Sequence, residues 1–295
     1  MHRVLLPFEF AEPTTVGEVV GMVDGQKAMV LAGGVDLVLK MRLRQILPEK
    51  VVSLQKVPGL DYVQEDGSGL RFGALASLRK IELSAVVRGG WPLLAEAIGL
   101  IASVQTKVMG TAIGNLCVGT PASDIAPALY ALGAGVTIVG TDSAREIPIK
   151  QFFVDVGKTA VQPHEIVAEI FIPRPPAGSA GAFMKLSKTS EDIAKVNAAV
   201  LVTIVDGACT DAKIALGSVA PTPVRASEAE RLLQGRGMNA RTIAEAAEAA
   251  AEAATPISDV RSTAAYRKEM VRVLVKDALE KAAARALARG GGHHA

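Results

Sequence analysis

The chain has 295 residues, of which 49% are apolar and 21% charged, a composition that is typical of a folded protein and excludes a disordered one. The net charge of +2, with acids and bases interspersed, excludes the basic surface of a nucleic-acid-binding protein. No apolar run is long enough for a transmembrane segment, and no signal-peptide core develops. Two distant cysteines are too few for a disulfide framework or an iron–sulfur cluster, so we expect a soluble, cytoplasmic protein of two or three domains.

Residues 1–57 predict a small α/β unit in which strands and helices alternate. A capping box from Thr15 to Glu18 indicates the start of its first helix. Gly33 and Gly34 separate a buried-type strand from the helical pattern that follows it. The predicted strands are 7–10, 27–31 and 51–54, and the second predicted helix is 35–43.

Residues 58–175 predict a second α/β unit. Asp66–Gly69 indicates the turn of a hairpin between two short strands, and the glycine-containing segment 110–124 predicts a loop. Proline and glycine accumulate from 172 to 181, so we place the end of this unit at 175. The other predicted elements are helices at 78–86, 91–101 and 125–132 and strands at 135–140 and 145–153.

Residues 176–289 predict a C-terminal unit of three strands followed by three helices. A capping box at Ser227–Glu230 indicates the start of the first helix, and the alanine-rich stretch 241–254 predicts the second. The third helix is predicted from 259 to 288. Residues 290–295 predict a flexible tail whose two histidines do not form a metal site. The predicted strands are 182–188, 198–205 and 212–219.

Several stretches partly match known catalytic or nucleotide-binding motifs, but each lies in the wrong structural context or lacks one required residue. Gly235-x-Gly237-x-x-Ala240 fits a dinucleotide fingerprint as text but follows a helix, so it predicts a helix–helix connection. Phe152 stands where a P-loop would need glycine, and Ala168 stands where a zincin helix would need its second histidine. The sequence therefore gives no support to a hydrolase, a nucleotide kinase or a zinc protease.

Two segments of small residues remain as candidates for ligand binding. The first, Ala32–Asp36, joins a strand to a helix, where missing side chains free successive N–H groups to face an anion at the helix N-terminus. The second, 110–127, combines N–H and hydroxyl donors for phosphate oxygens with the Asp124 carboxylate for sugar hydroxyls. Each segment alone is more often a structural turn. Two of them in one domain favour a ligand that contains a diphosphate and a ribose.

Three stretches carry a resemblance to a known family: "LAGGVDLVLKMR", "GTAIGNLC…PASDIAPALYAL" and "EIVAEIFIP…AFMKLSK…EDIA". They resemble the FAD-binding (medium) subunit of the molybdenum hydroxylases, the family of aerobic carbon monoxide dehydrogenase and of the flavin portion of xanthine dehydrogenase. The resemblance covers residues 1–287. It implies an α+β fold: an FAD-binding domain of the type shared with vanillyl-alcohol oxidase-like flavoproteins, made of two α/β subdomains, plus a C-terminal domain with a three-stranded antiparallel sheet and a helix bundle.

The resemblance also implies which residues bind the cofactor. The first segment would wrap the FAD diphosphate, the second would close on it, and Asp124 would hold a ribose. Ile101 and Val167 match apolar positions that line the flavin, and Lys185 matches a lysine that reaches the isoalloxazine, where a cation stabilises the reduced ring. The alternative for Lys185 is a surface lysine on a strand. The implied cofactor-binding set is Val30, Leu31, Ala32, Gly33, Gly34, Val35, Asp36, Leu37, Ile101, Gly110, Thr111, Ala112, Ile113, Gly114, Asn115, Thr120, Asp124, Val167 and Lys185.

The chain departs from the family pattern at several of these positions. The second segment commonly reads TIGGN, and Ala112-Ile113-Gly114 replaces Ile-Gly-Gly here. Ile113 restricts φ and adds bulk beside the expected phosphate. Lys107 and Lys188 stand where arginine is common, and Glu191 precedes the "DIA" that an aromatic residue usually precedes. These differences bear on the affinity for FAD and on the electron acceptor.

In function, the resemblance implies an oxidoreductase subunit within a heterotrimer. A large partner with the molybdenum cofactor would oxidise the substrate, and a small partner with [2Fe-2S] clusters would pass electrons to FAD on this chain and on to NAD⁺, oxygen or a quinone. The heterotrimers are expected to pair into a dimer. Two alternatives stay open: a stand-alone FAD-dependent oxidoreductase, and a cofactor-less assembly or scaffold subunit, which Ile113 favours.

Overall fold

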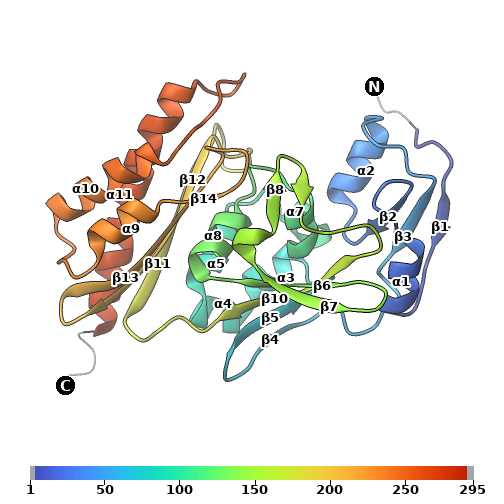
Figure 1. Ribbon diagram of the computed structural model, residues 1–295, viewed down its shortest axis with the longest axis horizontal. Coiled ribbons are helices and arrows are strands. Elements are labelled where there is room, and N and C mark those ends of the chain that lie inside the picture. The colour runs from blue at the N-terminus through green and yellow to red at the C-terminus, as the bar shows by residue number, and fades with distance from the viewer. Residues whose placement is uncertain (1–3, 291–295) are drawn as a thin grey trace.

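The computed structural model describes residues 4–290, arranged as three successive units (Figure 1). The N-terminal unit lies at one end, the C-terminal unit at the other, and the second unit between them. No helix among the described residues is both long and apolar enough to cross a membrane. The predicted tail 290–295 lies outside the described residues, apart from Gly290.

The N-terminal unit is a three-stranded parallel sheet with two helices. Its strands lie in the order β1-β3-β2, so β3 pairs with both neighbours. The Thr15 hydroxyl accepts from the Glu18 N–H and the Glu18 carboxylate accepts from the Thr15 N–H, which confirms the predicted capping box. The elements are β1 (Glu9–Ala11), α1 (Val16–Met22), β2 (Ala28–Leu31), α2 (Val35–Arg42) and β3 (Lys50–Ser53).

The second unit is a five-stranded antiparallel sheet with helices packed against it. Strand β10 pairs with β5 and β6 in the centre, and β4 and β7 form the edges. A short ribbon of β8 and β9 follows the sheet strand β7. The strands are β4 (Val63–Glu65), β5 (Gly69–Gly73), β6 (Gly135–Val139), β7 (Ala144–Pro148), β8 (Phe153–Asp155), β9 (Lys158–Thr159) and β10 (Ile166–Pro173). The helices are α3 (Leu78–Leu83), α4 (Ala85–Gly90), α5 (Pro92–Gly99), α6 (Val104–Met109), α7 (Ala112–Cys117) and α8 (Ile125–Leu132).

The C-terminal unit is an antiparallel sheet covered by three helices. Strands β11, β12 and β13 are the three long strands predicted from the sequence, and a two-residue strand, β14, extends the sheet to four. The elements are β11 (Ser179–Leu186), β12 (Val196–Val205), β13 (Ala208–Gly217), β14 (Val224–Arg225), α9 (Ser227–Leu233), α10 (Ala240–Glu252) and α11 (Ala264–Gly290).

Strand β12 is apolar on both faces because it lies between two cores. Ala199 and Leu201 belong to the core shared with the second unit, whereas Ala198, Val200 and Val202 belong to the core under α9–α11. This alternation follows from the two-residue period of a strand. Helices α5 and α8 contact the sheet from the second unit, and α11 contacts it from the other side (Figure 1). The C-terminal sheet thus packs against the second unit on one face and against its own helices on the other.

The hydrophobic core does not divide at residue 57. One continuous cluster of buried residues runs from Val19 in α1 through Ile172 in β10 to Ala215 in β13, so the first two units share a core that also reaches one face of the C-terminal sheet. A second cluster lies between the C-terminal sheet and α9–α11. The boundaries at 57 and 175 stay predictions.

Four local predictions were wrong. The strand predicted from 145 to 153 ends at Pro148, where a short 3-10 helix, Ile149–Gln151, interrupts it. The segment 110–124 is not one loop, because α7 occupies its first half. The Ser227–Glu230 capping box does not form: Ala226 is the N-cap, and the Glu230 carboxylate instead accepts from the Arg225 side chain at 2.6 Å and the Ile214 N–H at 2.8 Å. The last helix begins at Ala264, because the Asp259 carboxylate accepts from the N–H groups of 261 and 262 and forms a turn instead.

Candidate functional site

The first glycine segment is a sharp bend from β2 into α2. Gly34 is the N-cap of α2 and has φ 73°, a left-handed conformation that glycine adopts without strain. Within the described chain no side chain caps this helix, so the N–H groups of its first turn are open to the oxygens of a ligand. The bend therefore leaves a helix N-terminus with free N–H groups, which is the feature that an anion-binding site requires.

Gly33 lets the two glycine segments touch. A Cβ atom at Gly33 would lie 2.0 Å from the Met109 carbonyl oxygen and 2.9 Å from Gly110 Cα. Gly110 is close in turn to Val35, since a Cβ there would lie 3.5 Å from Val35 Cγ2. The bend at 32–36 and the start of the segment 110–115 are therefore in backbone contact on one side of a shared cleft.

The second segment continues from that contact as helix α7. Thr111 is its N-cap, and the Thr111 hydroxyl accepts from the Gly114 N–H at 3.0 Å. Ile113 lies in the first turn, so its backbone is right-handed and needs no glycine. Its side chain is 4% exposed and packs in the main core. The expected strain at Ile113 is therefore absent, and most of its bulk is buried in the protein.

Both bends open into one cavity of about 780 Å³. Such a volume is in the range of sites that hold cofactors. Two implied residues do not line it: Leu31, the last residue of β2, and Ala112, which is fully buried. The implied residues that do line the cavity are Val30, Ala32, Gly33, Gly34, Val35, Asp36, Leu37, Ile101, Gly110, Thr111, Ile113, Gly114, Asn115, Thr120, Asp124, Val167 and Lys185.

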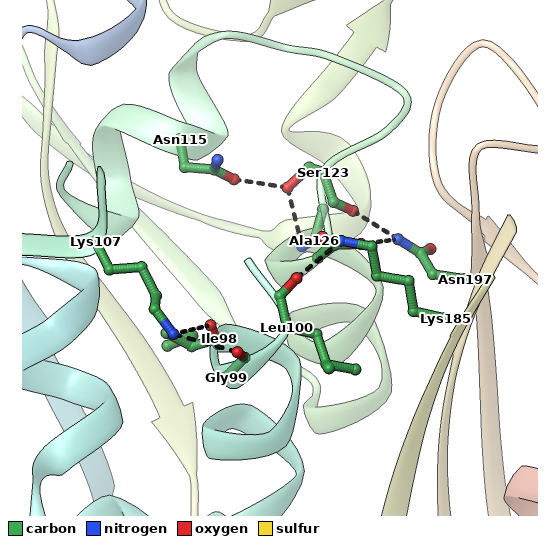
Figure 2. A network of polar contacts seen from close by, with 10 residues as sticks. Ile98, Gly99, Leu100, Lys107, Asn115, Ser123, Ala126, Lys185 and Asn197 are labelled. Carbon is green, nitrogen blue, oxygen red and sulfur yellow. Dashed lines mark hydrogen bonds and ion pairs between the residues drawn. The ribbon is translucent and has the colours of Figure 1, made fainter. Parts of the chain in front are cut away.

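Lys185 is neither a surface lysine nor a free cation. Its ammonium donates to the Asp124 carboxylate at 2.6 Å. It also donates to the Leu100 carbonyl at 2.8 Å (Figure 2). The Asn197 amide donates to the other Asp124 oxygen at 2.7 Å. The side chains of Lys185 and Asp124 are 3% and 7% exposed. Burial raises the pKa of the Asp124 carboxyl above its ordinary value, and the Lys185 ammonium and the Asn197 amide oppose that rise.

This ion pair joins the second unit to the C-terminal sheet. Asp124 lies at the start of α8, while Lys185 and Asn197 lie opposite each other on β11 and β12. Ser123 extends the network: its hydroxyl donates to Asn115 at 2.9 Å and accepts from the Ala126 N–H at 3.3 Å (Figure 2). The network thus fixes the cavity wall next to α7.

Lys107, which replaces the arginine common in the family, stabilises the end of α5. Its ammonium is buried and pairs with Glu82 at 2.9 Å. It also donates to the carbonyls of Ile98 and Gly99 at 3.4 and 3.2 Å (Figure 2). A cation at a helix C-terminus satisfies its last carbonyls. Ile101, two residues beyond α5, is thereby held at the cavity wall.

Some residues that line the cavity were not foreseen from the sequence. They include the turn 24–26, where the Asp24 carboxylate accepts from three backbone N–H groups at 2.8 Å, and the loop 161–163. Asp24-Gly25 signals a turn, but nothing in the sequence indicates that it faces a ligand. Cys117 also lines the cavity and is exposed.

The comparisons with known proteins agree with this geometry. A family model for the FAD binding domain in molybdopterin dehydrogenase matches residues 6–175, and one for the CO dehydrogenase flavoprotein C-terminal domain matches residues 181–282. The carbon monoxide dehydrogenase medium chain of Afipia carboxidovorans is 33% identical over 281 residues, which cover 95% of this chain and 98% of that one.

Solved structures give the same result. A carbon monoxide dehydrogenase from Hydrogenophaga pseudoflava matches with a TM-score of 0.92 at 34% identity, and quinoline 2-oxidoreductase from Pseudomonas putida 86 matches with a TM-score of 0.92 at 25% identity. Each match covers 96% of this chain and 99% of the other. The α+β fold predicted from the resemblance is confirmed. The chain belongs to the family of FAD-binding medium subunits of the molybdenum hydroxylases.

Proposed function

We propose that this chain binds FAD in the cavity between its two glycine bends and serves as the electron-transfer subunit of a molybdenum-containing hydroxylase or dehydrogenase. Electrons from the [2Fe-2S] clusters of a partner subunit would leave through FAD to an external acceptor. The observation that carries the proposal is the backbone contact between Gly33 and the Met109–Gly110 peptide at the edge of one large cavity.

The residues at the bends fit a diphosphate. The uncapped first turn of α2 supplies N–H donors, and the hydroxyls of Thr111 and Thr120 line the same cavity. The Asn115 amide oxygen already accepts from Ser123, which leaves its NH₂ group for a ligand oxygen. Oriented N–H dipoles at a helix N-terminus favour negative charge, so no arginine is needed here.

Other parts of the cavity fit the flavin and the ribose. Ile101 and Val167 present apolar surface, which suits an aromatic ring system. Asp124 and Lys185 line the same cavity, so a carboxylate and an ammonium can meet the polar edges of the cofactor. When bound, FAD supplies the redox chemistry, and the protein supplies binding, orientation and electrostatics. The Lys185 ammonium, held by Asp124 and Leu100, would bring a fixed positive charge to the flavin.

The stand-alone flavoenzyme is the weaker alternative. Among the described residues, no histidine or tyrosine lines the cavity as an acid–base group for a substrate. The scaffold alternative depended on Ile113, whose helical backbone and buried side chain leave the cavity open. Both observations favour the electron-transfer subunit.

We further propose the partners and the compartment. The matched relatives include medium chains of carbon monoxide dehydrogenase, so we infer a small [2Fe-2S] subunit and a large molybdenum-cofactor subunit, assembled as a dimer of heterotrimers. Among the described residues, no group of histidine, cysteine and acidic side chains is arranged to hold a metal ion. Both cysteines are free thiols, which suits the reducing cytoplasm.

Affinity purification of the tagged chain from cells that express its partner subunits tests this proposal. We expect equimolar flavin by absorbance, together with iron and molybdenum by elemental analysis. A chain that shows no saturable binding in an FAD titration would be a scaffold. A chain that binds FAD and alone completes substrate turnover would be a stand-alone enzyme.

A further inference from the structure

A second hollow lies behind the wall of the cofactor cavity. Its volume is about 230 Å³, and Thr120, Ala122 and Ile193 line both spaces. Its far side consists of the turn after β13, which contains Ser218, and of the segment 255–261 that precedes α11. The hollow therefore lies where the second unit meets the C-terminal unit.

Two hydrogen-bond donors in the wall of this hollow have no acceptor. The Ser218 hydroxyl and Arg267 Nε are buried and find no partner among the described residues. Their side chains line the hollow, and the two residues are 7% and 5% exposed. Leaving such groups unpaired is unfavourable, and more so for a charged group. Native structures normally supply an acceptor at such a place.

The charges around the hollow leave an excess of one positive charge. Arg267, which lines the hollow, donates to Asp259 at 2.6 Å and to the Ser218 carbonyl at 3.0 Å, and these two hydrogen bonds fix its guanidinium in place. Arg261 also pairs with Asp259, at 3.4 Å. Among the described residues that line the hollow, these two arginines and one aspartate are the charged groups, so the sum of +2 and −1 is +1. A monoanion would balance it.

Most of the remaining wall is apolar. Val156, Ile193 and Ile257 rim the hollow although they are 57%, 55% and 70% exposed, and Pro121 and Pro221 lie deeper. Apolar walls disfavour a strongly hydrated dianion such as phosphate but suit a short hydrocarbon tail. A planar guanidinium matches the two oxygens of a carboxylate. We propose that this hollow is a binding site for a carboxylate that carries a short apolar chain.

The backbone at Ser218 offers a variant that removes a donor and preserves the fold. Ser218 has φ 64°, a conformation that strains serine and suits glycine. Ser218→Gly deletes the unpaired hydroxyl and is expected to retain or raise the melting temperature of the chain. Arg261→Gln removes the excess positive charge. It is expected to leave the fold intact, because the Arg261 side chain is 48% exposed and makes only a 3.4 Å ion pair. Arg241→Gln, on a side chain that is 87% exposed on α10, is the matched control.

The test is a titration of the full chain with sodium propionate, in which binding is measured by calorimetry and by the change in melting temperature. Propionamide, which has no charge, and sodium chloride at the same concentration are the controls. We expect saturable binding of propionate alone, weakened about tenfold in Ser218→Gly and in Arg261→Gln and unchanged in Arg241→Gln. Equal effects of propionamide or sodium chloride, no saturation, or full binding by both variants would overturn the proposal.

The same titration on the assembled complex identifies the source of the carboxylate. Binding that persists in the complex indicates a small carboxylate ligand, and binding that is lost there indicates that an acidic side chain of a partner subunit fills the hollow. Both outcomes require the site, since both require propionate binding by the isolated chain. Flavin content, measured on the same samples, reports separately on the proposed function.

Discussion

Gly33→Ala adds one methyl group at the contact between the two glycine bends. The new Cβ would stand 2.0 Å from the Met109 carbonyl oxygen, whereas real Cβ contacts stay above 3.0 Å, so the backbone must move by about 1 Å. Both Met109 and Gly110 meet the methyl group with backbone atoms, which cannot rotate away. The bends must therefore separate where the ligand's diphosphate is expected to lie.

The size of the effect follows from the cost of overpacking. Forcing extra volume into a packed site costs about 1–3 kcal/mol. If FAD binding has to draw the bends together again, this cost appears in the affinity, as a loss of about 5- to 150-fold. The part of the strain that separation of the bends does not relieve stays in the FAD-free chain and should lower its melting temperature, at about 2–4 °C per kcal/mol.

Fluorescence titration of the FAD-free chain measures this affinity directly. Gly89→Ala is the control, because a Cβ at Gly89 meets nothing within 4 Å and Gly89 lies in helix α4, away from the cavity wall. We expect the control to bind FAD as the unaltered chain does. A Gly33→Ala variant with unaltered affinity would refute the idea that contact between the bends shapes the cofactor site.

Three further predictions follow from the site and from one turn. Bound FAD should protect Cys117, which lines the cavity, from a mercurial reagent. Cys209 is buried and should react slowly with or without FAD. Mass spectrometry of the labelled peptides measures both reactions. Lys185→Met leaves the Asp124 carboxylate buried without its partner and should lower the free energy of unfolding by about 3–5 kcal/mol in urea, part of which Asp124→Asn should restore. Asp66, whose pKa is lowered to about 2 by hydrogen bonds from Ser68 and Gly69, stabilises the hairpin turn only while ionised. Because its folded pKa lies below the ordinary value of about 3.9, the advantage over Asp66→Asn should be complete at neutral pH and should disappear as the pH falls toward 2.

Each of these has a result that would contradict it. Equal labelling of Cys117 with and without FAD would place the cofactor elsewhere. Full stability of Lys185→Met would mean that the ion pair with Asp124 does not hold the units together. Melting temperatures of Asp66→Asn that differ from the unaltered chain by the same amount at pH 7 and pH 2 would exclude ionisation of Asp66 as the cause.

Local patterns predicted most of the elements because each is specified by neighbouring residues. The Thr15–Glu18 capping box, the hairpin turn at Asp66–Gly69 and the bend at Gly33–Gly34 all depend on contacts within a few positions, and all three form. Strand β12 of the C-terminal sheet is apolar on both faces, so its apolar run was also visible in the sequence. Contacts between neighbouring residues therefore sufficed to predict most of the helices, strands and turns.

The failures involve partners that are distant in sequence. Glu230 could have completed a capping box with Ser227, but the N–H of Ile214 on β13 competes for its carboxylate. Lys185 pairs with Asp124 across 61 positions, and no periodicity of either segment indicates it. Helix α7 was missed because Gly114 weakens helical propensity, while the Thr111 cap and burial of Ile113 overcome that weakness.

The resemblance implied that the two glycine bends bind the same cofactor, before the structure showed that they are in contact. Spacing alone suggested a diphosphate and a ribose but did not name the ligand, and only the fold shows the bends in contact at one cavity. The ion pair between Lys185 and Asp124 adds what the resemblance did not contain, namely how the positive charge is held at the cavity wall.

The most direct test of the account is an experimental structure of the chain with FAD bound. The account predicts that the diphosphate lies between the first turn of α2 and the start of α7, within hydrogen-bonding distance of the N–H groups that follow Gly34. A diphosphate bound elsewhere in the cavity, for example over the turn 24–26, or FAD bound outside the cavity would contradict it.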